Sequence, residues 1–126
     1  MKYILDTNVL IYSLCNPNEL SSEAKRIITT EKDLSISIVS LWEIAIKQSI
    51  GKLNIQLKIP QIENICISRD IAILPLTSNE IENVKNLPNI HKDPFDRIII
   101  SQAQLNSMSL ITSDTTIPQY NVSTVW

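Results

Sequence analysis

The sequence has very little glycine, cysteine or histidine, and these shortages exclude several classes of protein. Its 126 residues contain one glycine, two cysteines and one histidine. A single glycine excludes collagen-like chains, glycine-rich linkers and glycine-rich phosphate loops. Cys15 and Cys66 stand far apart and match neither a disulfide framework nor a zinc-ligand spacing. No window approaches twenty apolar residues, so we expect no membrane-spanning segment.

The chain also lacks an excess of basic residues. Eleven lysines and arginines stand against 13 aspartates and glutamates, which gives a formal net charge of −2. Proteins that bind nucleic acid through bulk charge are usually basic, so a nucleic-acid function here needs another source of positive charge. A bound divalent cation is one such source.

The sequence does contain enough apolar side chains for one core. Hydrophobic residues make up 44% of the chain and charged residues 19%. That composition is typical of a folded protein and argues against a disordered tail. We predict a single domain over residues 1–126, a length too short for two ordinary domains. The first residues form an apolar strand pattern without signal-peptide features, so we expect a cytoplasmic protein.

Short apolar runs alternate with helical patterns along the chain. Strands are predicted at residues 3–5, 34–39, 71–74, 110–112 and 122–125. Helix-starting signals lie between them, at Ser22, Ser40, Pro60, Thr77 and the pair Asp93-Pro94. Gly51 stands where a helix would end in a left-handed residue. This order predicts an α/β fold, with a mostly parallel five-stranded sheet in three layers and helices on both faces.

Acidic residues stand at the positions where a parallel sheet has its ligand site. In such folds ligands bind outside the carboxyl ends of the strands. Asp6 ends the first strand, and Glu43 is predicted in the first helical turn after the second. Asp96 lies in the first turn of a later helix, and Asp114 follows the fourth strand. We expect these four carboxylates to converge on one edge of the sheet.

Four carboxylates at one edge need a cation to hold them together. Like charges a few ångströms apart repel each other, so at least one acid would otherwise hold a proton. Mg²⁺ or Mn²⁺ takes oxygen ligands and keeps several waters, and a few acids with a substrate phosphate form its usual site. The sequence has no cluster of histidine or cysteine that would favour zinc. A cation in such a site activates water and neutralises charge on a phosphodiester.

Each acid also has a structural explanation of its own. Asp6 is suited to cap the helix that follows it, and Glu43 to close a capping box with Ser40. Asp96 suits the first turn of a helix, where the helix dipole favours an acid, and Asp114 suits a turn. Only the joint placement of the four favours chemistry, and that placement depends on the predicted fold.

Other polar residues near the acids are weaker candidates. Three hydroxyl side chains flank the acids and are suited to orient a water molecule, namely those of Thr7, Thr112 and Ser113. Lys47 and Arg97 are candidates for a phosphate contact, although each is equally explained as a solvated helix charge. His91 has no nucleophilic partner motif, so we expect it to lie on a loop surface or to cap a helix. Asp93 is most simply an N-cap, outside the site.

Four segments of the chain resemble the PIN-domain family. They are residues 1–10 (MKYILDTNVL), 39–47 (VSLWEIAIK), 91–103 (HKDPFDRIIISQA) and 110–114 (LITSD). They occur in the family's order over the whole chain, and the four together are fairly specific although each alone is weak. More narrowly, they resemble the VapC-type toxins of bacterial toxin–antitoxin pairs.

The resemblance implies a PIN fold and a Mg²⁺- or Mn²⁺-dependent endoribonuclease that cuts RNA, such as tRNA or rRNA, and so inhibits translation. Asp6, Glu43 and Asp96 match the three core acids of the family, and Asp114 matches the more variable fourth. By the same resemblance, these acids are the catalytic and metal-binding residues.

The resemblance also extends to a neighbouring residue and to partners. Thr7 or Asn8 falls where the family often has a polar residue beside the first acid, and Asn8 joins the residues suited to orient substrate or water. The family implies a homodimer and a small VapB-like antitoxin whose tail blocks the site. Operator DNA is then contacted only through the antitoxin.

Other functions compete with this one. A non-catalytic RNA-binding or scaffolding relative would share the fold, although the four retained acids argue against it. A phospho-acceptor signalling domain needs an acid after a central strand, but strand 71–74 is followed by Pro75. A dehalogenase-type phosphatase needs an aspartate two positions after Asp6, where Asn8 stands.

Overall fold

Five parallel strands form one sheet in the computed structural model, which describes residues 1–126. The strands are β1 (Tyr3–Leu5), β2 (Leu34–Ser37), β3 (Ile71–Leu74), β4 (Ser109–Ile111) and β5 (Thr124–Val125). They lie in the order β3-β2-β1-β4-β5, and every neighbouring pair is parallel. The chain runs outward from β1 to β3 and returns to β4 on the other side of β1. The carboxyl ends of β1 and β4 therefore flank the topological switch point, where such sheets bind ligands.

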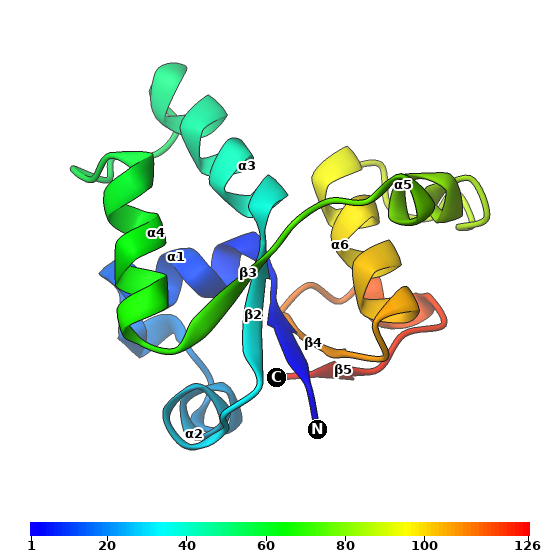
Figure 1. Cartoon of the computed structure of the whole chain (residues 1–126), viewed down its shortest axis with the longest axis horizontal. Coiled ribbons are helices and arrows are strands. Elements are labelled where there is room, and N and C mark those ends of the chain that lie inside the picture. Colours follow the sequence, from blue (N-terminus) through cyan, green and yellow to red (C-terminus); the bar gives the residue numbers. More distant parts are fainter.

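Helices cover both faces of the sheet. They are α1 (Thr7–Cys15), α2 (Ser22–Thr30), α3 (Ile38–Ser49), α4 (Ile59–Ser68), α5 (Ser78–Val84) and α6 (Pro94–Leu105), with short 3₁₀ turns at Pro17–Glu19 and Ile117–Gln119. Figure 1 shows α1, α2 and α4 on one side of the strands and α5 and α6 on the other. The predicted α/β architecture is confirmed. None of the helices is long and apolar enough to cross a membrane.

Each face of the sheet has its own apolar core, because neighbouring strand residues point to opposite faces. Leu5 belongs to a cluster of 15 buried residues, and Ile4 belongs to a second cluster of 10. The alternation in β2 suggested a polar face, yet Ser35 and Ser37 are buried as well. Helices on both faces leave no solvent-exposed side to this part of the sheet.

The boundary between β2 and α3 differs from the prediction. The strand ends at Ser37 and the helix begins at Ile38, whereas the sequence pattern predicted a helix start at Ser40. Ser37 is the N-cap, since its hydroxyl accepts a hydrogen bond from the Val39 N–H at 3.1 Å. Isoleucine and valine fit a strand and a buried helical turn equally, so periodicity did not locate the junction. Glu43 therefore lies in the second turn of α3 and forms no capping box with Ser40.

Other helix ends follow the prediction more closely. Asp93 caps α6, and Gly51 follows α3 with a φ of +74°, a conformation that glycine adopts without strain. The cap of α2 is Ser21, one residue before the predicted Ser22, because the Ser21 hydroxyl accepts from the Ala24 N–H at 3.0 Å.

Candidate metal centre

The switch point of the sheet brings Asp6 and Asp114 to the same edge. Asp6 directly follows β1, and Asp114 lies in the loop after β4. Asp6 accepts hydrogen bonds from the Val9 N–H at 2.8 Å and from the Thr112 hydroxyl, so it is also the N-cap of α1. The Thr112 oxygen accepts the Asp114 N–H at 3.0 Å. One threonine therefore connects two of the acids.

Glu43 lies on α3 and is held by Lys47 one turn later. The glutamate is 4% exposed, and its Oε2 lies 2.9 Å from the Lys47 ammonium. Its Oε1 is buried and has no hydrogen-bond partner. A buried carboxylate oxygen without a donor costs free energy, so this atom is available to a cation. Burial opposes the charge on Lys47, but the contact with Glu43 outweighs it and raises the lysine pKa above its ordinary value.

His91 joins Asp96 and Asp114 in one cluster. Its Nε2 lies 2.8 Å from Asp114 Oδ2 and 3.1 Å from Asp96 Oδ2. Its Nδ1 accepts the Asp93 N–H at 3.1 Å, so the ring proton belongs on Nε2, between the two carboxylates. His91 lies in a loop, as predicted, and its Nδ1 accepts the N–H of Asp93, the N-cap of α6; its contact with two carboxylates was not predicted. Its place in the loop just before α6 was the only sequence signal that could have linked it to Asp96.

The pKa values of Asp96 and Asp6 show that the acids act on one another. Burial raises the pKa of Asp96 to about 7, with the charges of Asp93, Asp6 and Glu43 adding to the effect and His91 opposing it. Burial raises the pKa of Asp6 to about 6, with further contributions from the charges of Asp114 and Glu43. Both carboxylates therefore lie where negative charge is disfavoured until a cation compensates it.

Asp114 differs from the other two aspartates. Burial works against its charge, but hydrogen bonds from His91 and from the Thr116 N–H outweigh burial and lower its pKa. The carboxylate is thus ionised over the whole physiological range. We use the term acidic site for Asp6, Glu43, Asp96 and Asp114 together.

The remaining candidates occupy several environments. The Thr7 hydroxyl donates to the Ser40 hydroxyl at 2.9 Å and so connects α1 to α3. Asn8 and Ser113 are exposed next to Asp6 and Asp114. The Arg97 guanidinium donates to backbone carbonyls, including that of Pro88 at 2.9 Å, which explains this residue without a phosphate contact. Asp93 caps α6, as predicted.

The donor set fits a hard divalent cation. Most of its donor atoms are carboxylate oxygens. One of them, Glu43 Oε1, has no hydrogen-bond partner, and Asp6 and Asp96 have raised pKa values. His91 Nε2 and one oxygen each from Asp96 and Asp114 lie within 4.8 Å of one another. Because Nε2 carries a proton, the histidine donates to the carboxylates rather than offering a lone pair. Oxygen ligands of this kind suit Mg²⁺ and Mn²⁺.

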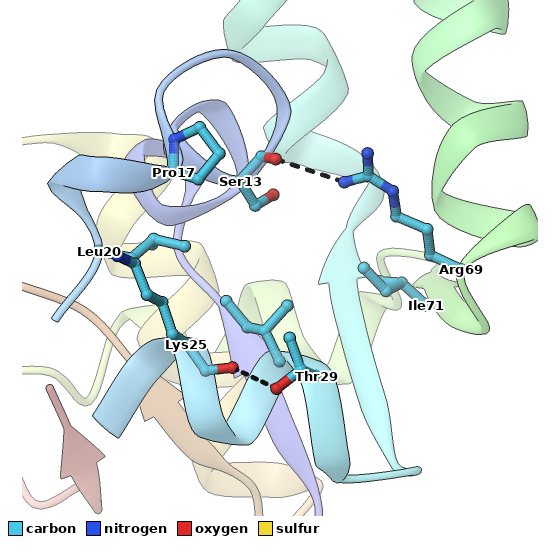
Figure 2. Close-up of a pocket in the computed structure, with 8 residues that line it drawn as sticks. Ser13, Pro17, Leu20, Lys25, Thr29, Arg69 and Ile71 are labelled. Atoms are coloured by element: carbon cyan, nitrogen blue, oxygen red, sulfur yellow. Dashed lines mark hydrogen bonds between the residues drawn. The ribbon is translucent and has the colours of Figure 1, made fainter. Parts of the chain in front are cut away.

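A separate cavity of about 410 Å³ lies away from these acids. Figure 2 shows Arg69 beside it, with its guanidinium donating to the Ser13 carbonyl at 3.3 Å. Ile71, the first residue of β3, lines the cavity, which places it near the amino end of that strand. No residue of the acidic site lines it.

Known proteins match the chain over nearly its whole length. The PIN domain family model matches residues 3–122. The structure of VapBC2 from Rickettsia felis bound to a promoter DNA fragment is similar at a TM-score of 0.73 and 17% identity, over 99% of this chain and 98% of that one. VapBC-1 from nontypeable Haemophilus influenzae has a TM-score of 0.69 and 22% identity, over 99% and 97%. DNA-bound VapBC from Salmonella typhimurium has a TM-score of 0.70 and 17% identity, over 99% and 97%.

At these identities the three structures show a likeness of fold. No curated protein sequence matches the chain significantly. The family model and the structural likeness agree with the α/β topology of the chain.

Proposed function

The chain belongs to the PIN domain family, a family of nucleases, and we propose that it is a metal-dependent endoribonuclease of the VapC toxin type. The observation that carries the proposal is the acidic site at the switch point. A cap or a turn explains each acid singly. Neither explains why Asp6 and Asp96 carry raised pKa values beside an orphaned oxygen of Glu43.

The four acids are proposed as the catalytic and metal-binding residues. Asp6, Glu43, Asp96 and Asp114 would hold Mg²⁺, with Mn²⁺ as a substitute. A bound ion of this kind lowers the pKa of water and neutralises charge on the phosphodiester. This local positive charge accounts for an RNA substrate in a protein of net charge −2.

The side chains around the acids hold them in place. Thr112 fixes Asp6 and the backbone of Asp114 through a single hydroxyl. Lys47 holds one oxygen of Glu43 and leaves the other free. Among the residues proposed to orient water or RNA, Asn8 and Ser113 remain the accessible ones, whereas the Thr7 and Arg97 side chains are engaged within the fold.

Partners follow from the same likeness. The similar structures are VapBC complexes, two of them with DNA, which supports a small VapB-like antitoxin as the partner of this chain. Operator DNA would then be bound through the antitoxin. Exposed apolar side chains also suit burial against a homodimer or an antitoxin, among them Trp42 at 59%, Ile50 at 58% and Ile67 at 59% exposure.

Cleavage of end-labelled total tRNA and rRNA by the antitoxin-free protein tests the proposal. Reactions contain Mg²⁺, Mn²⁺ or EDTA, and Asp96→Asn is compared with Asp33→Asn. Asp33 is an exposed acid at the amino end of β2, far from the acidic site in the topology, so its variant is the matched control. We expect discrete products that need metal, persist with Asp33→Asn and vanish with Asp96→Asn.

The alternative is a non-catalytic RNA-binding or scaffolding PIN protein. It predicts RNA retention in a filter-binding assay without cleavage under any metal condition. Products that survive EDTA, or that persist undiminished with Asp96→Asn, would contradict the proposed site.

A further inference from the structure

Arg97 directs its guanidinium at the chain segment that precedes α6. Nη1 donates to the Pro88 carbonyl at 2.9 Å, and Nη2 donates to the carbonyls of Val84 at 3.2 Å and Leu87 at 3.4 Å. Val84 is the last residue of α5, where the helix dipole favours a cation. No carboxylate pairs with this arginine, so its guanidinium donates to backbone carbonyls and to the Tyr120 hydroxyl instead.

Tyr120, which follows α6 in the sequence, contacts the same segment. The residue is 4% exposed, and its hydroxyl donates to the Pro88 carbonyl at 3.0 Å. The Tyr120 hydroxyl oxygen accepts the His91 N–H at 2.7 Å and the Ile90 N–H at 3.3 Å. Arg97 Nη1 also lies 3.3 Å from it. Two buried or half-buried side chains thus satisfy both the donors and the acceptors of one loop.

The segment they hold has no regular secondary structure of its own. Between the end of α5 and the start of α6, the chain forms only turns and irregular backbone. Its position therefore depends on side-chain contacts. His91 stands at the end of the held stretch, and its ring reaches the carboxylates of Asp96 and Asp114.

We propose that Arg97 and Tyr120 are positioning residues for the acidic site. By fixing the backbone of the Pro88–His91 stretch, they place the His91 ring so that one N–H serves two carboxylates. The histidine then fixes the orientation of Asp96 and Asp114 toward the cation. This role rests on the proposed metal-dependent function, and it assigns Arg97 a contact other than RNA phosphate.

Variants that remove each contact test the proposal. Tyr120→Phe removes only the hydroxyl, and Arg97→Met removes the guanidinium but keeps an apolar stem. Arg97→Lys retains a charged donor and is the conservative variant. The matched controls are Tyr12→Phe, whose hydroxyl makes no hydrogen bond within the chain, and Arg69→Met at the separate cavity in Figure 2.

Mn²⁺ affinity, measured by electron paramagnetic resonance below the melting temperature of every variant, is the first readout. Removal of a residue that orients metal ligands typically weakens metal affinity about 10- to 100-fold. We expect a loss of about tenfold for Tyr120→Phe and Arg97→Met, partial rescue by Arg97→Lys, and no change in either control.

The second readout needs no metal. His91 is the single histidine, so nitrogen NMR of the imidazole reports this ring alone. We expect the Nε2–H tautomer in the wild type and a mixture of tautomers in Tyr120→Phe and Arg97→Met. If both variants keep the wild-type tautomer and bind Mn²⁺ within twofold of the wild type, the residues are structural and the positioning role is wrong. If the wild type itself binds no Mn²⁺, the proposed function fails, and the positioning role fails with it.

Discussion

The molecule buries carboxylates in two places and treats them in opposite ways. Glu80, in the first turn of α5, is 6% exposed. It accepts the Thr77 N–H at 2.9 Å and amide hydrogens from Gln102 at 3.3 Å and Asn106 at 2.8 Å. Burial opposes its charge, but these donors outweigh burial and lower its pKa. In the acidic site burial prevails, and the pKa of Asp96 reaches about 7.

The difference separates a structural acid from one that we propose to be functional. Neutral amides and backbone N–H groups satisfy Glu80, so its charge stabilises the fold without any ion. Asp96 faces other acids and one shared imidazole N–H, and its charge remains costly until a cation arrives. One helix, α6, serves both places, with Asp96 in its first turn and Gln102 nearer its end. The direction of the pKa shift therefore distinguishes the two sites better than burial does.

The largest expected effect is on catalysis at the acidic site. Asp96→Asn removes a charged ligand while leaving the size of the side chain unchanged. We expect cleavage to fall by more than about 100-fold, because loss of a ligand exceeds the typical outer-shell effect. The melting temperature of the metal-free variant should be equal to or above that of the wild type, since a disfavoured charge is lost. A variant with wild-type activity would remove Asp96 from the site.

Glu80→Gln should instead lower the stability of the fold and leave RNA cleavage unchanged. The amide loses the charge-assisted hydrogen bonds and turns an NH₂ group toward Gln102 or Asn106. We expect a loss of about 2 kcal/mol in the free energy of unfolding, with RNA cleavage unchanged below the melting transition. Glu82→Gln is the control, since that exposed glutamate pairs only with Lys85 and should change stability by less than about 0.5 kcal/mol. Equal urea midpoints for the two variants would contradict the structural role of Glu80.

Thr112 gives the acidic site one feature of the Glu80 environment. Its neutral hydroxyl donates a hydrogen bond to Asp6, as several neutral groups do to Glu80. Thr112→Val keeps the shape and removes the hydroxyl. We expect Mn²⁺ affinity to fall about tenfold, and Thr112→Ser to restore most of it. Calorimetric titration with Mn²⁺ measures both. Full affinity in Thr112→Val would show that the Thr112 hydroxyl is not needed to hold Asp6 and Asp114 in place.

The sequence predicted the positions of Asp6 and Asp114 after strands β1 and β4, for a physical reason. In a parallel sheet every carboxyl end lies at one edge, so an acid directly after a strand, such as Asp6, has a predictable location. The helix start predicted at Thr77 was equally local, and it is confirmed, with Thr77 and Glu80 forming a capping box. A cap or a strand end requires knowledge of only a few neighbouring residues.

Contacts between distant segments could not be predicted in the same way. His91 reaches Asp114 only because Arg97 and Tyr120 hold an irregular loop, and no periodicity describes such a loop. The amide partners of Glu80 likewise lie more than 20 residues away, Gln102 on α6 and Asn106 at the C-cap of that helix. These contacts depend on tertiary packing, as does the orientation of each side chain toward the site.

A further expected effect is on the pH dependence of stability, and its sign differs between the two places. Asp6 and Asp96 have folded pKa values of about 6 and about 7 against an ordinary 3.8. Between these limits the folded chain binds more protons than the unfolded chain, so stability falls as pH rises from about 4 to 7. Glu80 has a lowered pKa, so its contribution is present above its ordinary pKa of 4.5 and is lost as pH falls below it.

Metal-free protein should therefore lose stability, and melt at a lower temperature, as pH rises from about 5 to about 8. Saturating Mg²⁺ should abolish that fall, because the cation replaces the protons on the acids. Asp96→Asn should flatten the slope above pH 5, whereas Glu80→Gln should alter only the acid side. Calorimetric scans of the wild type and of both variants at each pH, with Mg²⁺ and with EDTA, measure these changes in melting temperature. If Mg²⁺ raised the melting temperature equally at pH 5 and pH 8, the raised pKa values would not belong to the metal site, and the contrast between the two carboxylate environments would be lost.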